Sequence, residues 1–246
     1  MRKLTLAVLA AGAAAIAGPS LAADMPYYPP IIEIPDVDYG YTGSFYLRGS
    51  AGWHGHWARE VFHPTVGTVA PPVFAIEEWG YGYSFGVGAG YETGTGLRFD
   101  VTVDRLASEG MSATIPLIAA PDLTPGVHRL SLRSTVALAN AYYDVGFGDG
   151  YGAAGGPFAY IGAGAGVAFN DMVTTGPGPA DIRGGNTSFA AAGMAGLGYD
   201  FGQVVADVGY RALYINRLEN PNAPAPYSID NNWVHEVRGT VRYRFN

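Results

Sequence analysis

Arginine and carboxylate side chains recur at alternate positions in several stretches of this 246-residue chain. In the stretch 97–105, Arg98, Asp100 and Asp104 fall on one side of an extended backbone, and apolar residues fall on the other. Buried charges are tolerated when they pair, and a guanidinium group can bind a carboxylate with two donors. The pattern therefore predicts an interior network of ion pairs made by Arg48, Glu92, Arg98, Asp100, Asp104, Arg129, Arg133, Asp207, Arg211, Glu236, Arg238, Arg242 and Arg244.

Histidines form a second pattern, around residues 53–63. His54 and His56 share one face of a strand, and a carboxylate such as Glu60 would add a third metal ligand. The set completes no recognised metal-site spacing. We therefore predict no metal site and no cofactor.

The sequence gives even less support for a catalytic site than for a metal site. His128 with Ser131 and His235 with Glu236 are the nearest pairs to a base with its partner. His235 and Glu236 are neighbours in a predicted strand, so their side chains point to opposite faces. No catalytic residue is assigned, and we predict that the protein is not an enzyme.

Composition excludes several classes of function. The chain has no cysteine, which removes disulfides, thiolate zinc sites and thiol nucleophiles. Its formal net charge is −7, and it would be −9 without Arg2 and Lys3. Nucleic acid is not a predicted partner, because phosphate contacts need a basic surface.

The first 42 residues predict export followed by a tether. Arg2 and Lys3 precede an apolar run, 4–17, which is shorter than the roughly 20 residues of a membrane-spanning helix. A cut after Ala22 or Ala23 fits the small residues there, so we assign residues 1–22 to a signal peptide. Residues 23–42 are proline-rich and acidic and form a predicted periplasmic tether.

The remaining residues, 43–246, contain eight stretches with period-two alternation: 44–54, 81–92, 97–105, 129–143, 158–169, 188–199, 204–214 and 234–245. Alternation alone does not say which face is inside. Connections of about 26, 23, 18 and 19 residues alternate with shorter ones, prolines avoid the strands, and aromatic residues gather at strand ends. These features predict an all-β, eight-stranded antiparallel up-and-down transmembrane barrel. The predicted lipid-facing residues are Leu47, Val87, Val101, Leu132, Ile161, Leu197, Val208 and Val241.

Five segments carry a resemblance to a known family: Gly43–Gly49 (GSFYLRG), Asn140–Gly146 (NAYYDVG), Tyr160–Gly166 (YIGAGAG), Asp207–Arg211 (DVGYR) and Val241–Asn246 (VRYRFN). In their order along the chain, they resemble small outer-membrane β-barrel proteins of the OmpA and OmpX type, and the porin-family surface antigens of alphaproteobacteria. The resemblance implies the outer membrane of a Gram-negative bacterium, with outer-membrane lipids as partners.

The resemblance also implies contacts at the two ends of the mature chain. Tyr243 and Phe245 would be recognised by the outer-membrane insertion machinery, although Asn246 follows where the family usually ends on an aromatic residue. Related barrels that begin with Ala-Asp are joined to peptidoglycan through the N-terminal amine, which implies attachment at Ala23. The simpler interpretation is a leader without a partner.

The predicted function is structural: a barrel with surface-exposed loops that supports envelope integrity and acts as a surface antigen or in adhesion. The alternatives are a narrow porin-like channel and, with less support from the residues, a lipid-modifying outer-membrane enzyme. Eight inward arginines against five inward carboxylates would favour anions in any residual conductance.

Overall fold

The computed structural model describes residues 43–64, 73–117, 124–147, 155–178, 181–222 and 226–245. The predicted signal peptide (1–22) and tether (23–42), with Ala23, lie outside the described residues. Within those ranges, no helix has the length and apolar character needed to cross a membrane.

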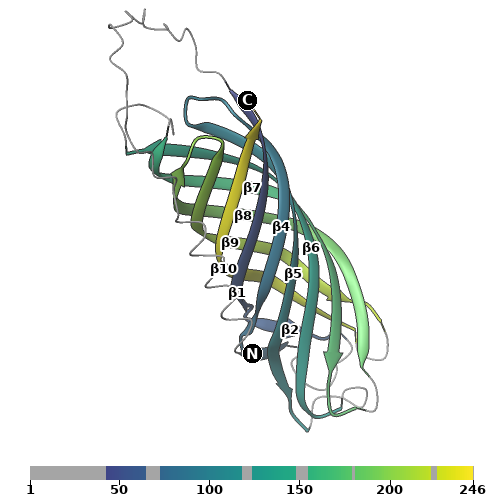
Figure 1. Ribbon diagram of the computed structural model, residues 1–246. Coiled ribbons are helices and arrows are strands. Elements are labelled where there is room, and N and C mark those ends of the chain that lie inside the picture. The colour runs from purple at the N-terminus through teal and green to yellow at the C-terminus, as the bar shows by residue number, and fades with distance from the viewer. Residues whose placement is uncertain are drawn as a thin grey trace, which may run out of the picture. The chain divides into compact units, whose positions relative to one another are not determined.

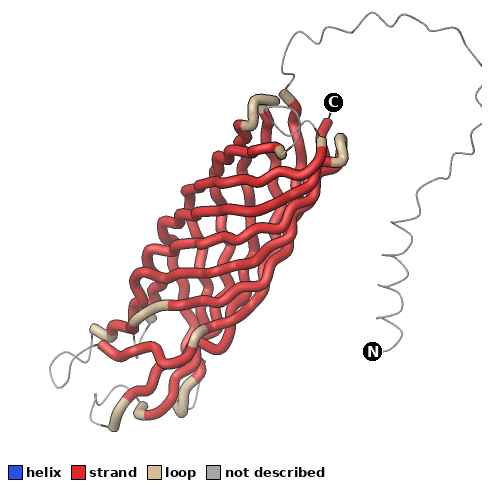
Figure 2. Tube along the Cα trace, turned by 90° about the vertical axis from the view of Figure 1, so that its left-hand side faces the viewer, coloured by secondary structure: helices blue, strands red, loops and turns tan. Residues whose placement is uncertain are grey.

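Ten antiparallel strands make up the described structure (Figures 1 and 2). They are β1 (Ser44–Trp57), β2 (Glu60–Phe62), β3 (Val73–Glu78), β4 (Gly80–Glu92), β5 (Leu97–Ile115), β6 (Gly126–Gly146), β7 (Gly156–Thr175), β8 (Ile182–Asp200), β9 (Val204–Asn220) and β10 (Tyr227–Phe245). Eight of them close a ring in which each strand pairs with its neighbour along the chain and β10 pairs with β1. The predicted eight-stranded up-and-down barrel is confirmed.

The strands are tilted within this ring. The hydrogen-bonded register that starts at Phe45 on β1 passes through all eight strands and returns to β1 at Gly55, ten residues further along. Such a stagger is the geometric condition for closing a sheet into a barrel. An eight-stranded barrel of this kind leaves an interior just wide enough for side chains to fill.

The two ends of the barrel differ. At one end, here the turn end, the connections are 93–96, 147–155 and 201–203; at the other, the loop end, they are 58–79, 116–125, 176–181 and 221–226. Three of the loop-end connections are much shorter than predicted, because β5 to β10 continue beyond the predicted stretches. The first holds β2 and β3, which pair with β10 and β5 and so extend the barrel wall.

The outer surface of the barrel carries a belt of exposed apolar side chains. Val101, Ile161, Val208 and Val241 are each more than half exposed. A continuous apolar belt around a barrel is unfavourable in water, whereas the acyl chains of a membrane solvate it. Seven of the eight predicted lipid-facing residues lie in this belt, which makes the barrel a transmembrane one.

The pattern reverses toward the loop end. On β5 the outward residues Leu97, Phe99, Val101 and Val103 are followed by Arg105, Glu109 and Thr114, while the inward series changes from Arg98, Asp100, Thr102 and Asp104 to Leu106, Met111, Ala113 and Ile115. A β-bulge between Ser108 and Met111 keeps the later residues in phase. The barrel is therefore apolar outside and charged inside along the belt, and polar outside and apolar inside at the loop end.

Candidate functional site: the closed barrel interior

The interior next to the belt is a layer of charged side chains, here called the charged layer. It contains six arginines and seven carboxylates: Arg48, Arg98, Arg211, Arg238, Arg242, Arg244, Glu92, Asp100, Asp104, Asp144, Asp200, Asp207 and Glu236. The two signs nearly balance, so the layer has almost no net formal charge.

Asp104 and Glu236 anchor the centre of the charged layer. Arg211 donates from Nη1 to Asp104 (2.8 Å) and from Nε and Nη2 to Glu236 Oε2 (2.8 and 2.5 Å). Arg238 Nη2 donates to the other Asp104 oxygen (2.8 Å), and Ser84 donates to Glu236 Oε1 (2.5 Å). The side chains of Asp104, Glu236 and Arg211 have no exposed surface. Each charge is therefore paired, as burial requires.

Asp100 gathers a second set of donors nearer the turn end. Its Oδ2 accepts hydrogen bonds from Arg48 Nη1 (2.8 Å) and the Tyr46 hydroxyl (2.9 Å), and its Oδ1 accepts one from Asn140 (2.7 Å). Arg48 also donates to the Tyr142 hydroxyl at 2.8 Å. These residues come from β1, β5 and β6, so the network joins strands across the interior.

A third set closes the turn end. Arg98 binds Asp144 with two donors at 3.0 and 3.1 Å and lies over the Tyr142 ring, 4.0 Å from its centroid. Arg244 donates to Glu92 (2.8 and 3.0 Å) and to Asp200 (2.6 Å). Asp144 and Asp200 were not among the predicted network residues, although Asp144 keeps the alternation of β6 that places Asn140 and Tyr142 inside.

Arg242 is the least well satisfied arginine of the charged layer. Its closest carboxylate oxygens lie 3.4 Å (Glu92), 3.6 Å (Asp144) and 3.9 Å (Asp207) away. Its Nε and Nη2 have no hydrogen-bond partner within the described part of the chain. The Phe158 ring faces its guanidinium group at 5.4 Å. Three nearby carboxylates and an aromatic face thus compensate this charge from a distance.

Inward glycines make room for these side chains. A Cβ added at Gly86 would overlap Asp104 Oδ1, and one added at Gly198 would overlap the Phe158 ring. Small residues of β4, β7 and β8 therefore face long side chains of neighbouring strands. Long side chains opposite glycines thus fill the interior.

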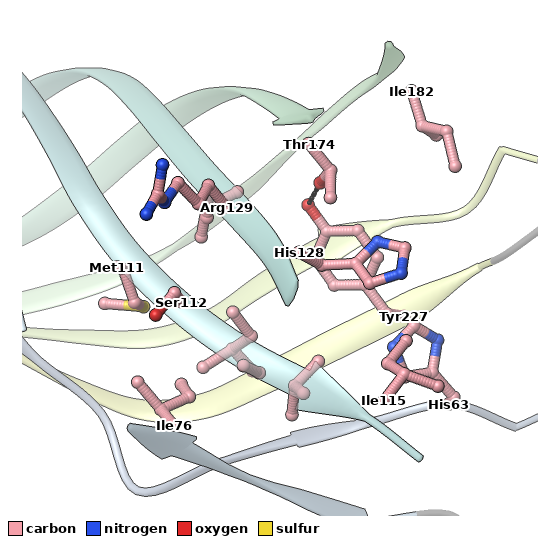
Figure 3. Close-up of a pocket in the computed structure, with 14 residues that line it drawn as sticks. His63, Ile76, Met111, Ser112, Ile115, His128, Arg129, Thr174, Ile182 and Tyr227 are labelled. Carbon is pink, nitrogen blue, oxygen red and sulfur yellow. Dashed lines mark hydrogen bonds between the residues drawn. The ribbon is translucent and has the colours of Figure 1, made fainter. Parts of the chain in front are cut away.

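The loop-end half of the interior is packed with apolar side chains, here called the apolar layer. Its fully buried members include Leu106, Leu132, Val136, Leu213, Ile215 and Val234. Near the rim, His63, Met111, His128 and Tyr227 line a cavity of about 50 Å³, where Thr174 and Tyr227 share a hydrogen bond of 2.7 Å (Figure 3). A cavity of that volume has room for water.

The apolar layer overturns three predictions. Leu132, predicted to face lipid, is 1% exposed and lies inside. Arg129 and Arg133, predicted to face inward, point outward instead, and Arg133 pairs with Glu109 at 2.6 Å. The physical reason is the reversal of pattern: at this level the interior accepts leucine and the exterior meets a polar medium. The predicted surplus of positive charge in the interior is also wrong, because these two arginines lie outside and two further carboxylates, Asp144 and Asp200, lie inside.

The histidine and catalytic candidates are separated by the fold. His54 and His56 are buried in the interior, and His54 Nε2 lies 2.6 Å from the Ser108 hydroxyl. His235 lies outside, hydrogen-bonded to Tyr210 at 2.5 Å, while Glu236 lies inside. Across the described ranges, no three His, Asp or Glu residues are grouped as metal ligands.

His128 and Ser131 also face opposite ways on β6. Nε2 of His128 donates to the Thr124 carbonyl at 2.8 Å and makes no contact with the serine. The residues first considered for acid–base chemistry thus do not meet as sets.

The interior is closed to water by both layers. Asp104, Arg211, Glu236 and Arg242 have side chains with no exposed surface, so no water-sized opening reaches them. Leu213 and Val234, in the apolar layer above, are equally inaccessible. Fold and interior together define a small transmembrane β-barrel with a filled lumen.

Comparison with known proteins gives similarity without a family assignment. No family model matches the sequence. An uncharacterized protein of Brucella suis biovar 1 is 26% identical over 297 aligned residues, which cover 99% of each chain.

Similar solved structures include Neisserial surface protein A, with 22% identity, a TM-score of 0.48 and coverage of 83% of this chain and 99% of that one. The outer membrane protein OprG from Pseudomonas aeruginosa has 13% identity, a TM-score of 0.43 and coverage of 82% and 97%.

Proposed function

We propose that this protein is a structural β-barrel of the outer membrane of a Gram-negative bacterium. Its loop end faces the cell surface, where the connections act as a surface antigen or in adhesion, and the barrel itself supports envelope integrity. The exposed apolar belt supports a location in a membrane, and a closed transmembrane barrel fits the outer membrane of such cells.

The filled lumen carries the proposal. A transport pore needs a continuous water-filled path, whereas Arg211 and Glu236 are inaccessible to water and Leu213 and Val234 close the interior above them. Opening the charged layer would separate ion pairs in a region of low dielectric constant, and that separation is strongly unfavourable. What remains accessible is the outer surface, so the function is assigned to the loops and the wall.

Planar-bilayer recording tests this proposal against the channel alternative. The purified barrel should give no stable conductance steps, while an open trimeric porin inserted under the same conditions gives large ones. Since the six arginines and seven carboxylates nearly balance, any residual leak should show no preference for anions. Stable steps that carry several ions at once would overturn the assignment.

Labelling of intact cells tests the orientation. The chain has no cysteine, so Asn222→Cys at the loop end and Thr95→Cys at the turn end each give a single reactive thiol. A membrane-impermeant maleimide should label Asn222→Cys on intact cells and should label Thr95→Cys only after lysis. Equal labelling of the two before lysis would contradict the surface location of the loop end.

Two contacts implied by the sequence remain part of the proposal. Tyr243 and Phe245 on β10 would present the insertion signal, and Ala23 would provide the amine for attachment to peptidoglycan. Muramidase digestion of purified cell walls, followed by mass spectrometry of the N-terminal peptide, tests the attachment. A free amine at Ala23 throughout would rule it out.

A further inference from the structure

The ring of aromatic side chains at the loop-end edge of the belt is interrupted on β5 and β6. Outward aromatics mark this edge on the other barrel strands: Trp53 on β1, Tyr83 on β4, Phe169 on β7, Phe189 on β8, Tyr214 on β9 and Trp233 on β10. On β5, Val103 is followed directly by outward Arg105, and on β6 the outward series reads Ala137, Thr135, Arg133. Two arginines thus stand where the ring lacks its aromatic residues.

Both arginines keep unused hydrogen-bond donors. Arg105 Nη1 donates to Thr135 Oγ1 at 2.7 Å, while its nearest carboxylate, Asp171, is 3.9 Å from Nη2. Arg133 donates to Glu109 at 2.6 Å and to the Leu132 carbonyl at 3.3 Å. The guanidinium side chains are 52% and 41% exposed. No other partner of either is found within the described ranges, so several N–H groups of each arginine have no protein acceptor there.

The position of these arginines relative to the membrane determines which partner their unused donors can bind. Arg105 follows Val103, the last outward aliphatic side chain of the belt on β5, and in the proposed orientation this position lies at the border between acyl chains and headgroups. An outward arginine there is unfavourable unless a polar partner from the membrane meets its donors. Phosphate is the partner that matches guanidinium geometry best, because it accepts two parallel hydrogen bonds.

The charge balance of this surface permits an anion. Asp171 and Glu109 lie further toward the loop end than Arg105, with side chains 77% and 57% exposed. They oppose an anion weakly, because they can turn toward water. Arg129 and Arg183 lie outward on the same side, and the described part of the chain holds no ion pair for either. Four outward arginines on this surface are thus matched in number by four exposed carboxylates, Glu77, Glu109, Asp171 and Asp181, and its formal charge is balanced.

The wall below the two arginines offers a smooth apolar face. A shallow concave surface on the outside of the barrel is lined by Val101, Ala139, Ala141, Ala163 and Ala165, on β5, β6 and β7, and it continues toward the turn end to aromatic side chains, Phe45, Tyr91, Phe99 and Phe245. Side chains of this size let straight acyl chains lie close to the backbone. A site for a headgroup and a surface for its chains therefore occur on one side of the barrel.

We propose that Arg105 and Arg133 bind the phosphate of a phosphorylated outer-leaflet glycolipid, whose acyl chains lie on the alanine face. The inference rests on the proposed membrane location and orientation and is independent of the closed lumen. It assigns to this wall of the barrel one tightly held lipid molecule.

Native mass spectrometry of the barrel in a neutral detergent tests the site. The probes are lipid A with both phosphates and the same lipid A after enzymatic removal of its phosphates. The unmodified protein should bind the phosphorylated lipid at least about tenfold more tightly, the factor expected from one lost charge-assisted contact. This comparison needs no variant.

Variants then locate the site. Arg105→Gln with Arg133→Gln should bring the affinity for the phosphorylated lipid down to that for the dephosphorylated one. Arg217→Gln is the matched control, because Arg217 is 50% exposed and paired with Asp230 at 2.6 Å on the loop-end part of β9. This control should bind like the unmodified protein. Resistance of each variant to unfolding in SDS without heating shows that it is folded.

Three results would overturn the proposal. The first is equal binding of the two lipids by the unmodified protein. The second is unchanged binding by the folded double variant, and the third is displacement of the lipid by inorganic phosphate at a similar concentration. A conducting barrel that still selects the phosphorylated lipid would contradict the closed lumen and leave this site supported, so the two claims fail separately.

Discussion

Replacing Asp104 with alanine removes the carboxylate that two buried arginines share. Arg211 and Arg238 each lose a hydrogen bond of 2.8 Å. Arg211 keeps Glu236, but Arg238 is left with a carboxylate oxygen of Glu236 at 3.9 Å and the hydroxyl of Ser50. A buried charge without its partner costs about 3–5 kcal/mol, so Asp104→Ala should lower the free energy of unfolding by that amount.

Urea unfolding of the barrel in phospholipid vesicles measures this loss. Asp230→Ala provides the matched control, because the Asp230–Arg217 pair is about half exposed and should lose at most about 1 kcal/mol. Removing both partners, with Asp104→Ala and Arg238→Ala together, should cost less than the sum of the single changes. A loss below about 1 kcal/mol for Asp104→Ala would refute the argument that burial makes these pairs indispensable.

Three further predictions concern the belt, the interior glycines and the loop end. Val101→Arg should lower stability in vesicles by about 2–4 kcal/mol, measured by the same urea unfolding, because the side chain lies in the lipid belt. Gly86→Ala should destabilise by about 1–3 kcal/mol because of the overlap with Asp104, whereas Gly49→Ala, with open space around it, should change stability by less than about 0.5 kcal/mol. Burial lowers the pKa of His63 to about 4, so the unfolded state takes up the proton first. Stability of the loop end, followed by hydrogen exchange, should therefore fall by up to about 3 kcal/mol from pH 6.5 to pH 4, and His63→Gln should reduce this dependence.

The belt half of the barrel could be predicted from sequence because its alternation is simple. From Leu97 to Asp104, apolar residues alternate with polar or charged ones, and the polar side is the one that a lipid environment forces inward. Arg98, Asp100 and Asp104 accordingly lie where they were predicted. The closure of the ring follows from the same pattern repeated eight times.

The loop-end half could not be predicted in the same way, because the medium outside the wall changes. Arg105 ends the predicted stretch of β5, although the strand continues to Ile115. Arg129 and Arg133 were placed inside by extending the rule of the belt to a region where leucine belongs inside. A sequence pattern of period two is the same in both halves, and only the surrounding medium decides its direction.

The two short strands depend on tertiary pairing. β2 has three residues, Glu60–Phe62, and its only backbone partners in the described structure are β3 and one position on β10. No local periodicity can indicate a strand of that length. Its position follows from the barrel wall, because β10 and β5 extend past the ends of β1 and β4 and pair there with β2 and β3.

A single-cysteine scan along β5 tests the central claim most directly. The claim is that the outer surface changes from apolar in the belt to polar at the loop end, while the interior is closed to water throughout. Spin labels report collision with oxygen, which concentrates in lipid, and with a water-soluble nickel complex. The positions are outward in the belt (Phe99, Val101, Val103), outward at the loop end (Glu109, Thr114) and inward (Thr102, Leu106). We predict oxygen access for the first set, nickel access for the second and neither for the third. Nickel access at Val101 would contradict the membrane belt, and nickel access at Thr102 would contradict the closed interior.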